Sequence, residues 1–419
     1  MLGRTPPRSL GYSPSFPNSL ATLAGIMRKA RRTTPPPPST PSPSPPSPPW
    51  KERSVLTAPA ALKPQRSLAA HLSAAASADW ELLPLPRSEL SLSVTLPTGQ
   101  TFRWRRTGSS HYTGVVGPHL LSLQHLESDP AGRVAFVLHN PGSSDSSSAR
   151  SVLSDFLNVH VSLGDLWDRF SLADARFAEL ASRFDGGARI LRQDPVECVF
   201  QFLCSSNNNI GRIEKMVGVL SSYGEYLGTV GGFDFHEFPS LERLSLVTEQ
   251  QLREAGFGYR AKYIVGAVKI LQGKPGGGAK WLASLRSLEL EEVIDALCIL
   301  PGVGPKVAAC IALFSLDQHH AIPVDTHVWQ IATKYLMPEL AGTRLSPKLY
   351  KSISEAFVAK FGEYAGWAQN VLFIGELPSH KASVELCAGE NKSANGGKRG
   401  RKRAAASLEQ DVSRSIVIK

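Results

Sequence analysis

Hydrophobic and polar residues alternate along the first part of the chain in the way typical of β-strands. Residues 90–94 show this alternation most cleanly, and a Pro-Thr-Gly-Gln turn signal follows them. Further short apolar stretches predict strands at residues 101–104, 114–116, 120–123 and 133–138, followed by a Gly/Ser-rich loop at 141–149. Helical spacing appears afterwards, at residues 163–170 and 173–184. An antiparallel sheet with added helices is therefore predicted.

From residue 194 onward the pattern becomes helical throughout. Apolar positions recur three and four residues apart, and a polar run of Ser and Asn at 205–209 separates the first two helices. Helices are predicted at residues 195–203, 210–226, 240–244, 248–255, 260–271, 280–285, 288–297, 305–316, 326–336, 347–361 and 365–373. The predicted fold class is therefore α+β, with a sheet domain at 79–192 packed on a mainly helical domain at 193–380.

The two ends of the chain differ in composition from its middle. Residues 1–78 hold ten Lys or Arg against one acid and a Pro/Ser tract, and residues 381–419 hold nine against four. Such segments bury too little apolar surface to offset chain entropy, so both are expected to be disordered. The total charge of +10, less +9 and +5 for the ends, leaves −4 for residues 79–380. The basic pI is therefore no argument that the middle binds nucleic acid.

Location and metal content follow from simple counts. No run of eighteen apolar residues exists, so no membrane span is predicted. The five cysteines are scattered and odd in number, which argues against zinc or iron–sulfur sites and for reduced thiols in an intracellular protein. The basic cluster at 398–403 predicts nuclear import, and the Arg/Ser-rich beginning is also typical of a transit peptide to a mitochondrion or chloroplast. Disordered tails without any signal share both compositions.

A Gly-rich hairpin before a helix makes residues 300–316 a candidate site. Pro305 suits the first helical position, where its missing N–H costs nothing, and this places Lys306 in the first turn. Gly302 and Gly304 let the free N–H groups of that turn approach an anion such as a DNA phosphate. The positive end of the helix and burial both favour a neutral amine. Lys306 is therefore a candidate nucleophile; the ordinary alternative is a solvated surface lysine.

Asp325 has the form of an N-cap for the helix predicted at 326–336. Its carboxylate is expected to accept hydrogen bonds from the N–H groups of Thr326, His327 and Val328, which favour the ionised form. Most aspartates in this position only cap a helix. The combination of a lysine and an aspartate, each at a helix start, nevertheless predicts an active site.

Five strings of the sequence resemble the eukaryotic 8-oxoguanine DNA glycosylase/AP lyases of the helix-hairpin-helix DNA glycosylase superfamily. They are LRQDPVECVFQFLCSSNNNIGRI, GFGYRAKY, LCILPGVGPKVAAC, PVDTHVW and YAGWAQNVLF, within a resemblance that covers about residues 92–377. It implies a base-excision repair enzyme, with N-glycosylase and AP lyase activities, whose sheet domain is TBP-like. It further implies a monomer that needs no cofactor, acts on double-stranded DNA containing oxidised guanine, and extrudes the damaged base into a pocket.

The resemblance also implies chemical roles for the candidate residues. Lys306 would attack C1′ of the damaged nucleotide, displace the base and form a Schiff base that permits strand cleavage by β-elimination. Asp325 would stabilise the positive charge that develops on the sugar. A structural cation at the hairpin would be held by the backbone carbonyls of Cys298, Leu300 and Val303.

Four residues are implied in recognition of the damaged base. The Gly99 carbonyl would accept the N7–H that 8-oxoguanine has and guanine lacks. Cys310 and Phe373 would sandwich the base, and Gln369 would bind its Watson–Crick edge. From the residues alone, Gly99 suits an ordinary turn, and Cys310 and Phe373 suit apolar core positions.

A second group is implied on the opposite strand. Asn207, Arg212 and Arg260 would recognise the orphaned cytosine, Tyr259 would wedge into the base stack, and His327 would join Gly302 and Gly304 in DNA binding by contacting a phosphate. The alternatives are a surface break between two helices for the asparagine run and a partly buried neutral imidazole for His327.

The sequence departs from the family pattern at Pro305, Ala309 and Thr326, which bears on lyase efficiency and cation binding more than on base excision. Two other functions remain open. The first is a monofunctional glycosylase of the same superfamily, against which Lys306 argues. The second is a non-catalytic DNA-binding protein that uses the hairpin only to hold phosphates.

Overall fold

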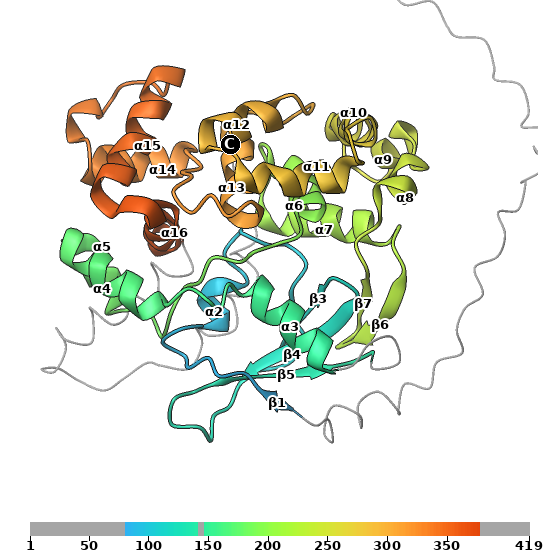
Figure 1. Ribbon diagram of the computed structural model, residues 1–419, viewed down its shortest axis with the longest axis horizontal. Coiled ribbons are helices and arrows are strands. Elements are labelled where there is room, and N and C mark those ends of the chain that lie inside the picture. Colours follow the sequence, from blue (N-terminus) through green and yellow to red (C-terminus); the bar gives the residue numbers. More distant parts are fainter. Residues whose placement is uncertain (1–79, 141–145, 378–419) are drawn as a thin grey trace, which may run out of the picture. The chain divides into compact units, whose positions relative to one another are not determined.

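The computed structural model describes residues 80–140 and 146–377, which all belong to one compact unit (Figure 1). The predicted extension at 1–78, the predicted tail at 381–419 and residues 141–145 of the predicted loop lie outside the described residues. Within them, an antiparallel sheet comes first and helices follow, so the predicted α+β class is confirmed. None of the described helices is long and apolar enough to cross a bilayer.

The N-terminal part is built on a five-stranded antiparallel sheet with the order β1-β5-β4-β3-β2. Its strands are β1 (Glu81–Leu82), β2 (Arg105–Arg106), β3 (Tyr112–Val116), β4 (His119–His125) and β5 (Val134–Leu138). Gly114 pairs with Leu121 and lies under Trp104, where an added Cβ would come within 2.4 Å of the indole. Helix α3 (Ser146–Phe156) covers the sheet and buries Leu153 and Phe156 in the same apolar cluster as Leu121 and Phe136.

Three sequence predictions in this part are wrong. Residues 90–94 do not form a strand, because helix α2 (Leu92–Thr95) occupies the segment. Nearly every side chain there is buried, and the backbone is satisfied without a neighbouring strand: the Leu92 N–H donates to the His125 side chain at 3.2 Å, and the Leu96 N–H donates to the Leu92 carbonyl. Residues 101–104 are not a strand either, since the Phe102 N–H donates to the Gln201 side chain instead of a neighbouring strand. Residues 146–149 begin helix α3 instead of continuing the predicted loop.

The helical part follows the predicted order closely. Its helices are α4 (Leu163–Ala173), α5 (Ala175–Ala181), α6 (Pro195–Ser205), α7 (Ile210–Ser221), α8 (Leu241–Ser245), α9 (Glu249–Glu254), α10 (Arg260–Gln272), α11 (Gly278–Ser284), α12 (Leu290–Cys298), α13 (Pro305–Ser315), α14 (Thr326–Tyr335), α15 (Pro347–Phe361) and α16 (Ala365–Glu376). Figure 1 shows α6 to α16 gathered above the sheet, with α5 beside α16. Side-chain caps at Asp194, Asn209 and Asp325 fix where three of these helices begin.

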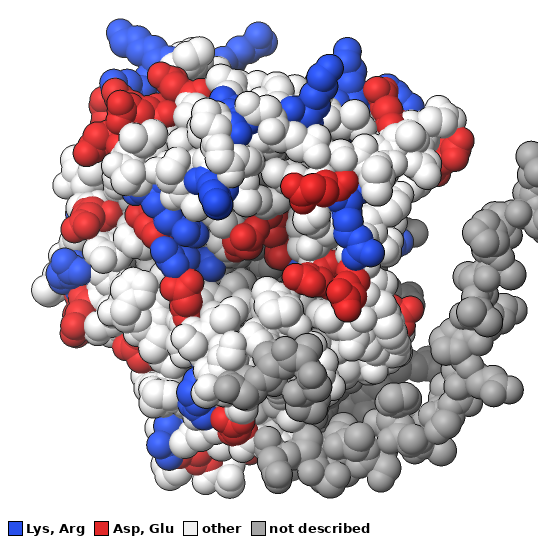
Figure 2. Space-filling model, turned by 45° about the vertical axis from the view of Figure 1, so that its right-hand side comes forward, with Lys and Arg blue, Asp and Glu red and all other residues white. Residues whose placement is uncertain are grey.

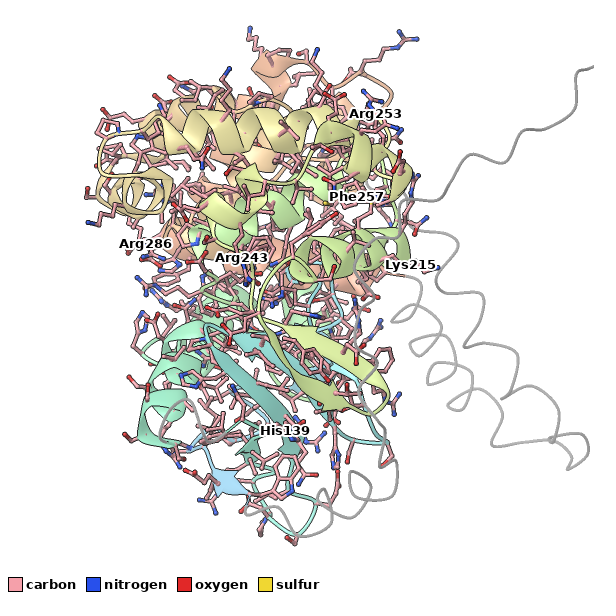
Figure 3. All side chains as sticks on the ribbon, turned by 90° about the vertical axis from the view of Figure 1, so that its right-hand side faces the viewer. His139, Lys215, Arg243, Arg253, Phe257 and Arg286 are labelled. Atoms are coloured by element: carbon pink, nitrogen blue, oxygen red, sulfur yellow. The ribbon has the colours of Figure 1, made fainter. Side chains whose placement is uncertain are left out.

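A two-stranded hairpin stands where the sequence predicted the end of a helix. Helix α7 stops at Ser221, and β6 (Tyr226–Val230) and β7 (Phe233–His236) follow. Gly224 is required in the turn after the helix because the Glu237 carbonyl lies 1.8 Å from where a Cβ would be, and Gly231 and Gly232 turn the hairpin with φ values of +57° and +81°. The hairpin lies against the sheet (Figure 3), with Phe235 in contact with Val115 and Leu120.

The sheet part and the helical part are joined by a network of charged side chains. Arg192 donates to both carboxylate oxygens of Asp317 at 2.7 and 2.8 Å and to Asp155 of α3 at 2.7 Å. Arg286 lies 3.5 Å from the same Asp317. Burial works to raise the pKa of Asp317, but the two arginines outweigh it and hold that pKa below its usual value. The network connects α3 to the loop that leads from α13 towards Asp325.

Candidate active site

A tight turn delivers the start of helix α13. Gly302 has a φ of +82°, and an added Cβ would lie 2.6 Å from the Tyr263 ring. The Leu300 carbonyl accepts the Val303 N–H at 3.0 Å and closes the turn, while Gly304 faces open space. The helix begins at Pro305, as predicted.

Lys306 lies half-buried in the first turn of α13. Its ammonium group is 6.0 Å from the centre of the Phe202 ring of α6, and among the residues that the structure describes it forms no ion pair. One turn further on, only 3% of Cys310 is exposed. Burial raises the pKa of the Cys310 thiol, and a hydrogen bond from Lys306 lowers it. The amine is therefore held against apolar and thiol groups instead of being neutralised by a carboxylate.

Asp325 caps helix α14 and is 6% exposed. One carboxylate oxygen, Oδ1, accepts the N–H groups of His327 and Val328, both at 2.9 Å. The expected hydrogen bond from Thr326 is not formed, because a capping side chain reaches the second and third N–H groups of a helix and not the first.

The structure brings Lys306 and Asp325 towards the same thiol. Both act on Cys310, where the carboxylate raises the pKa of the thiol and Lys306 lowers it. The two helix starts also share one partner, the hydroxyl of Tyr350 in α15, which lies 3.3 Å from the Pro305 carbonyl and 3.0 Å from the Ile322 carbonyl. Tyr350 was not predicted from the sequence, because it occupies an ordinary position on a helix.

The residues implied in base recognition are placed less closely. Gly99 has a φ of +91°, as its turn requires, and a Cβ added there would lie 3.9 Å from the side chain of Ile210 at the start of α7. The Phe373 ring in α16 is 6.1 Å from the His327 ring. Gln369 is buried on the same helix as Phe373. The sandwich of a base between Cys310 and Phe373 stays a prediction.

Buried glutamine side chains hold the loop that carries Gly99. Gln193 donates to the Gln100 carbonyl at 2.7 Å, and its own backbone N–H donates to the Phe314 carbonyl of α13 at 2.8 Å. Gln201 of α6 donates to Gln193 at 3.1 Å. The loop is thereby tied to the helix of Lys306, a connection that the sequence did not predict because its members are far apart in the chain.

The asparagine run ends one helix and starts the next, as the alternative interpretation expected. Asn207 has a φ of +47° and an exposed side chain. Asn208 donates to the Cys204 carbonyl at 2.9 Å, and Asn209 accepts the Arg212 N–H at 2.9 Å as the cap of α7. A role for Asn207 in DNA recognition stays a prediction.

Arg260 and Tyr259 lie against this asparagine loop. Arg260 is only 2% exposed and donates to the Ser206 carbonyl and, at 3.0 Å, to the Asn207 carbonyl. Its guanidinium group lies 4.6 Å from the centre of the Tyr259 ring, which is 46% exposed. Burial lowers the pKa of Arg260. Arg212 likewise donates to a backbone carbonyl, that of Gly256, at 3.2 Å.

The hairpin and the asparagine loop are neighbours through helix α10. The Tyr263 ring under Gly302 is 5.7 Å from the Tyr259 ring, in an edge-on contact. Figure 2 shows Lys and Arg side chains interspersed with Asp and Glu on one face, as expected for a middle segment with little net charge. Within residues 80–140 and 146–377, no group of three His, Cys, Asp or Glu side chains is arranged to hold a metal ion.

Two known families match consecutive parts of the chain. Residues 82–199 match the 8-oxoguanine DNA glycosylase N-terminal domain, and residues 200–341 match the HhH-GPD superfamily of base excision DNA repair proteins. The N-glycosylase/DNA lyase OGG1 of Arabidopsis thaliana is 61% identical over 306 residues, which are 73% of this chain and 82% of that protein. The N-glycosylase/DNA lyase of Saccharomyces cerevisiae is 34% identical over 332 residues, which are 72% of this chain and 87% of that protein.

A solved structure shows the same arrangement. The 8-oxoguanine glycosylase/lyase of Clostridium acetobutylicum, in complex with double-stranded DNA containing cytosine opposite 8-oxoguanine, superimposes with a TM-score of 0.59 at 27% identity. The match covers 75% of this chain and 98% of that one. On these matches the chain belongs to the 8-oxoguanine DNA glycosylase family, within the HhH-GPD superfamily of base excision DNA repair proteins.

Proposed function

We propose that this protein is a bifunctional DNA glycosylase/AP lyase that excises 8-oxoguanine opposite cytosine and then cleaves the strand. The observation that carries the proposal is that Lys306 and Asp325 each lie at the start of a helix and that the two helix starts share the Tyr350 hydroxyl, which lies 3.3 Å from the Pro305 carbonyl and 3.0 Å from the Ile322 carbonyl. The names of the Arabidopsis and yeast relatives and the DNA in the Clostridium complex support it.

In the proposed reaction the nitrogen of neutral Lys306 attacks C1′ of the damaged nucleotide. The bond from C1′ to the base breaks, and the base leaves with its electron pair and takes up a proton. Asp325, whose Oδ1 accepts two backbone N–H groups, stabilises the positive charge on the sugar. Ring opening gives a Schiff base on Lys306, and loss of a proton from C2′ expels the 3′ phosphate.

Recognition is proposed to use two surfaces. The Gly99 carbonyl, Cys310, Gln369 and Phe373 would hold the extruded base, which must leave the stack before its sugar can be attacked. On the other side, Asn207, Arg212 and Arg260 would bind the orphaned cytosine while Tyr259 fills the gap in the stack. The exposure of Tyr259 and its cation–π contact with Arg260 support this assignment.

Borohydride trapping on a duplex with one 8-oxoguanine tests the proposal. Wild-type protein is expected to form a covalent adduct and to nick the strand fastest opposite cytosine, and Lys306→Gln is expected to form no adduct. Asp325→Asn keeps a good helix cap, so its stability should change by less than about 1 kcal/mol while excision falls by at least about 10²-fold. A wild-type protein that excises without an adduct would instead be monofunctional, and one that binds without excision would be a DNA-binding protein only.

The remaining assignments extend the proposal. The protein acts as a monomer without a cofactor, and a cation at the hairpin would have to be held by backbone carbonyls of Cys298, Leu300 and Val303. Of these, the Leu300 carbonyl already accepts the Val303 N–H. The basic cluster at 398–403 supports a nuclear location, and the N-terminal extension supports a second one in an organelle. Imaging a fluorescent fusion with and without residues 398–403 checks the first, which is wrong if the two distributions are the same.

A further inference from the structure

The partly buried hydroxyl of Tyr350 has a backbone carbonyl neighbour from each of two helix starts. It donates towards the Ile322 carbonyl at 3.0 Å and lies 3.3 Å from the Pro305 carbonyl. Burial raises the pKa of the Tyr350 phenol, and the Val324 N–H lowers it.

These neighbours adjoin the two proposed catalytic residues. Pro305 immediately precedes Lys306, and residues 322–324 lead directly into Asp325. No ion pair joins Lys306 to Asp325 in the part of the chain that the structure describes, so their separation is not set by direct contact. Besides burial, the charges of Cys310 and Asp325 raise the pKa of the Tyr350 phenol.

The helix that carries Tyr350 is otherwise anchored elsewhere. Helix α15 buries Ile353, Phe357 and Phe361 in the apolar core, where Phe361 contacts Phe170 at 5.6 Å between ring centres. Tyr350 lies one turn before this apolar face, at the end of α15 nearest the site. The hydroxyl is thus held by a helix whose own position does not depend on the loops that it joins.

We propose that Tyr350 is a positioning residue for the reaction: its hydroxyl ties the start of α13 to the start of α14 and so fixes the distance between Lys306 and Asp325. Tyr350 itself contacts neither the base nor the sugar in this arrangement. The inference rests on the proposed function, because it assigns the spacing of the same two residues. A misplacement of about 1 Å in such a pair can cost roughly 10²-fold in rate.

The test compares Tyr350→Phe with Tyr335→Phe. Tyr335 in α14 also loses one hydroxyl contact, to Glu376 at 3.4 Å, but that contact ties neither helix start. Single-turnover excision of 8-oxoguanine opposite cytosine, adduct formation with an abasic duplex and DNA affinity are measured for each. Tyr350→Phe is expected to lower both rates by at least about tenfold with DNA affinity within about twofold of wild type, and Tyr335→Phe should change none of them by more than about twofold.

Two results would overturn the inference. One is a Tyr350→Phe protein whose excision rate stays within about twofold of wild type. The other is a loss of DNA affinity as large as the loss of rate, which would indicate a general structural role. Should Tyr350→Phe not fold, Tyr350→His, whose ring is too short to reach both carbonyls, takes its place with the same outcomes. An inactive wild-type protein would contradict the proposed function instead, which separates the two failures.

Discussion

The contacts of the His319 imidazole depend on its charge state. Its ring stacks on Tyr364 with 4.9 Å between ring centres, and its Nδ1 accepts the indole N–H of Trp367 at 3.2 Å. Burial lowers the pKa of His319 below its usual 6.5. Protonation would remove the acceptor that Trp367 uses. The charged or titratable groups that face the ring are Asp317, Glu363, His160 and His320.

A lowered pKa in the folded state has a definite consequence for stability. The unfolded chain takes up a proton near pH 6.5 while folded His319 stays neutral, so its contribution is fully present above that pH and is lost as the pH falls below it. The melting temperature of wild type should therefore fall more between pH 7 and about pH 5 than that of His319→Phe, which keeps the stacking. If the melting temperatures of the two proteins fall equally with pH, His319 does not contribute to the pH dependence of stability.

Lys306 and Asp325 can be picked out from the sequence because each has a local signature. The Gly-Pro turn and the capping position each depend on residues that are adjacent in the sequence, and the structure forms both as predicted. The role of Tyr350 depends on two carbonyls that lie 28 and 45 residues away. Hydrogen bonds between residues so far apart in the sequence do not affect its hydrophobic periodicity. Such residues can therefore be identified only from the folded structure.

The hairpin before α13 works as an element because of two glycines with different constraints. Gly302 needs a left-handed backbone and has the Tyr263 ring 2.6 Å from the position of an added Cβ, whereas Gly304 has an extended backbone and free space around it. The first glycine is required by packing, and the second leaves open space where a phosphate is proposed to bind.

Alanine at each glycine separates these two functions. Gly302→Ala should lower the free energy of unfolding by about 1–3 kcal/mol, since it adds backbone strain and displaces Tyr263. Gly304→Ala should cost at most about 1 kcal/mol but weaken binding to duplex DNA. Chemical denaturation and a DNA titration measure the two effects. If Gly302→Ala is as stable as wild type, the turn does not depend on the glycine.

Elements with strong periodicity were predictable, and those set by tertiary contacts were not. Helices α10, α13 and α15 begin at the residues that the sequence predicted. The β6–β7 hairpin was missed because its strands are short, exposed on one side and made by glycine geometry rather than by an apolar pattern. The segment at 90–94 alternates like a strand but has no strand beside it to pair with, and it turns into a helix instead.

At the scale of the whole molecule, Arg192 joins the sheet part to the helical part. Replacing it by alanine would leave Asp317 with Arg286 alone, at 3.5 Å, and would release Asp155. The predicted boundary between residues 192 and 193 therefore falls inside a connected region. The position of that boundary stays a prediction.

Arg192→Ala is expected to lower the free energy of unfolding by about 1–3 kcal/mol, because it removes several charge-assisted hydrogen bonds. Arg253→Ala serves as the control, since its pair with Glu249, one turn earlier in α9, is exposed, so its loss should cost less than about 0.5 kcal/mol. Urea denaturation measures both. Equal values for the two variants would mean that the Arg192 network adds nothing beyond an ordinary surface pair.

The hydrogen bonds that Arg260 makes within the free protein bear on how the enzyme interacts with undamaged DNA. One guanidinium nitrogen, Nη2, already donates to the carbonyls of Ser206 and Asn207, while the buried Nε has no hydrogen-bond partner among the described residues. Giving up the two Nη2 hydrogen bonds is favourable only where DNA offers other acceptors. In an intact duplex the edge of each cytosine is occupied by its guanine. In the proposed recognition, a cytosine that has lost its partner has free acceptors, and only there would Arg260 exchange its hydrogen bonds. The free enzyme would then have little tendency to bind undamaged DNA through this residue, because Arg260 keeps its hydrogen bonds to its own backbone carbonyls.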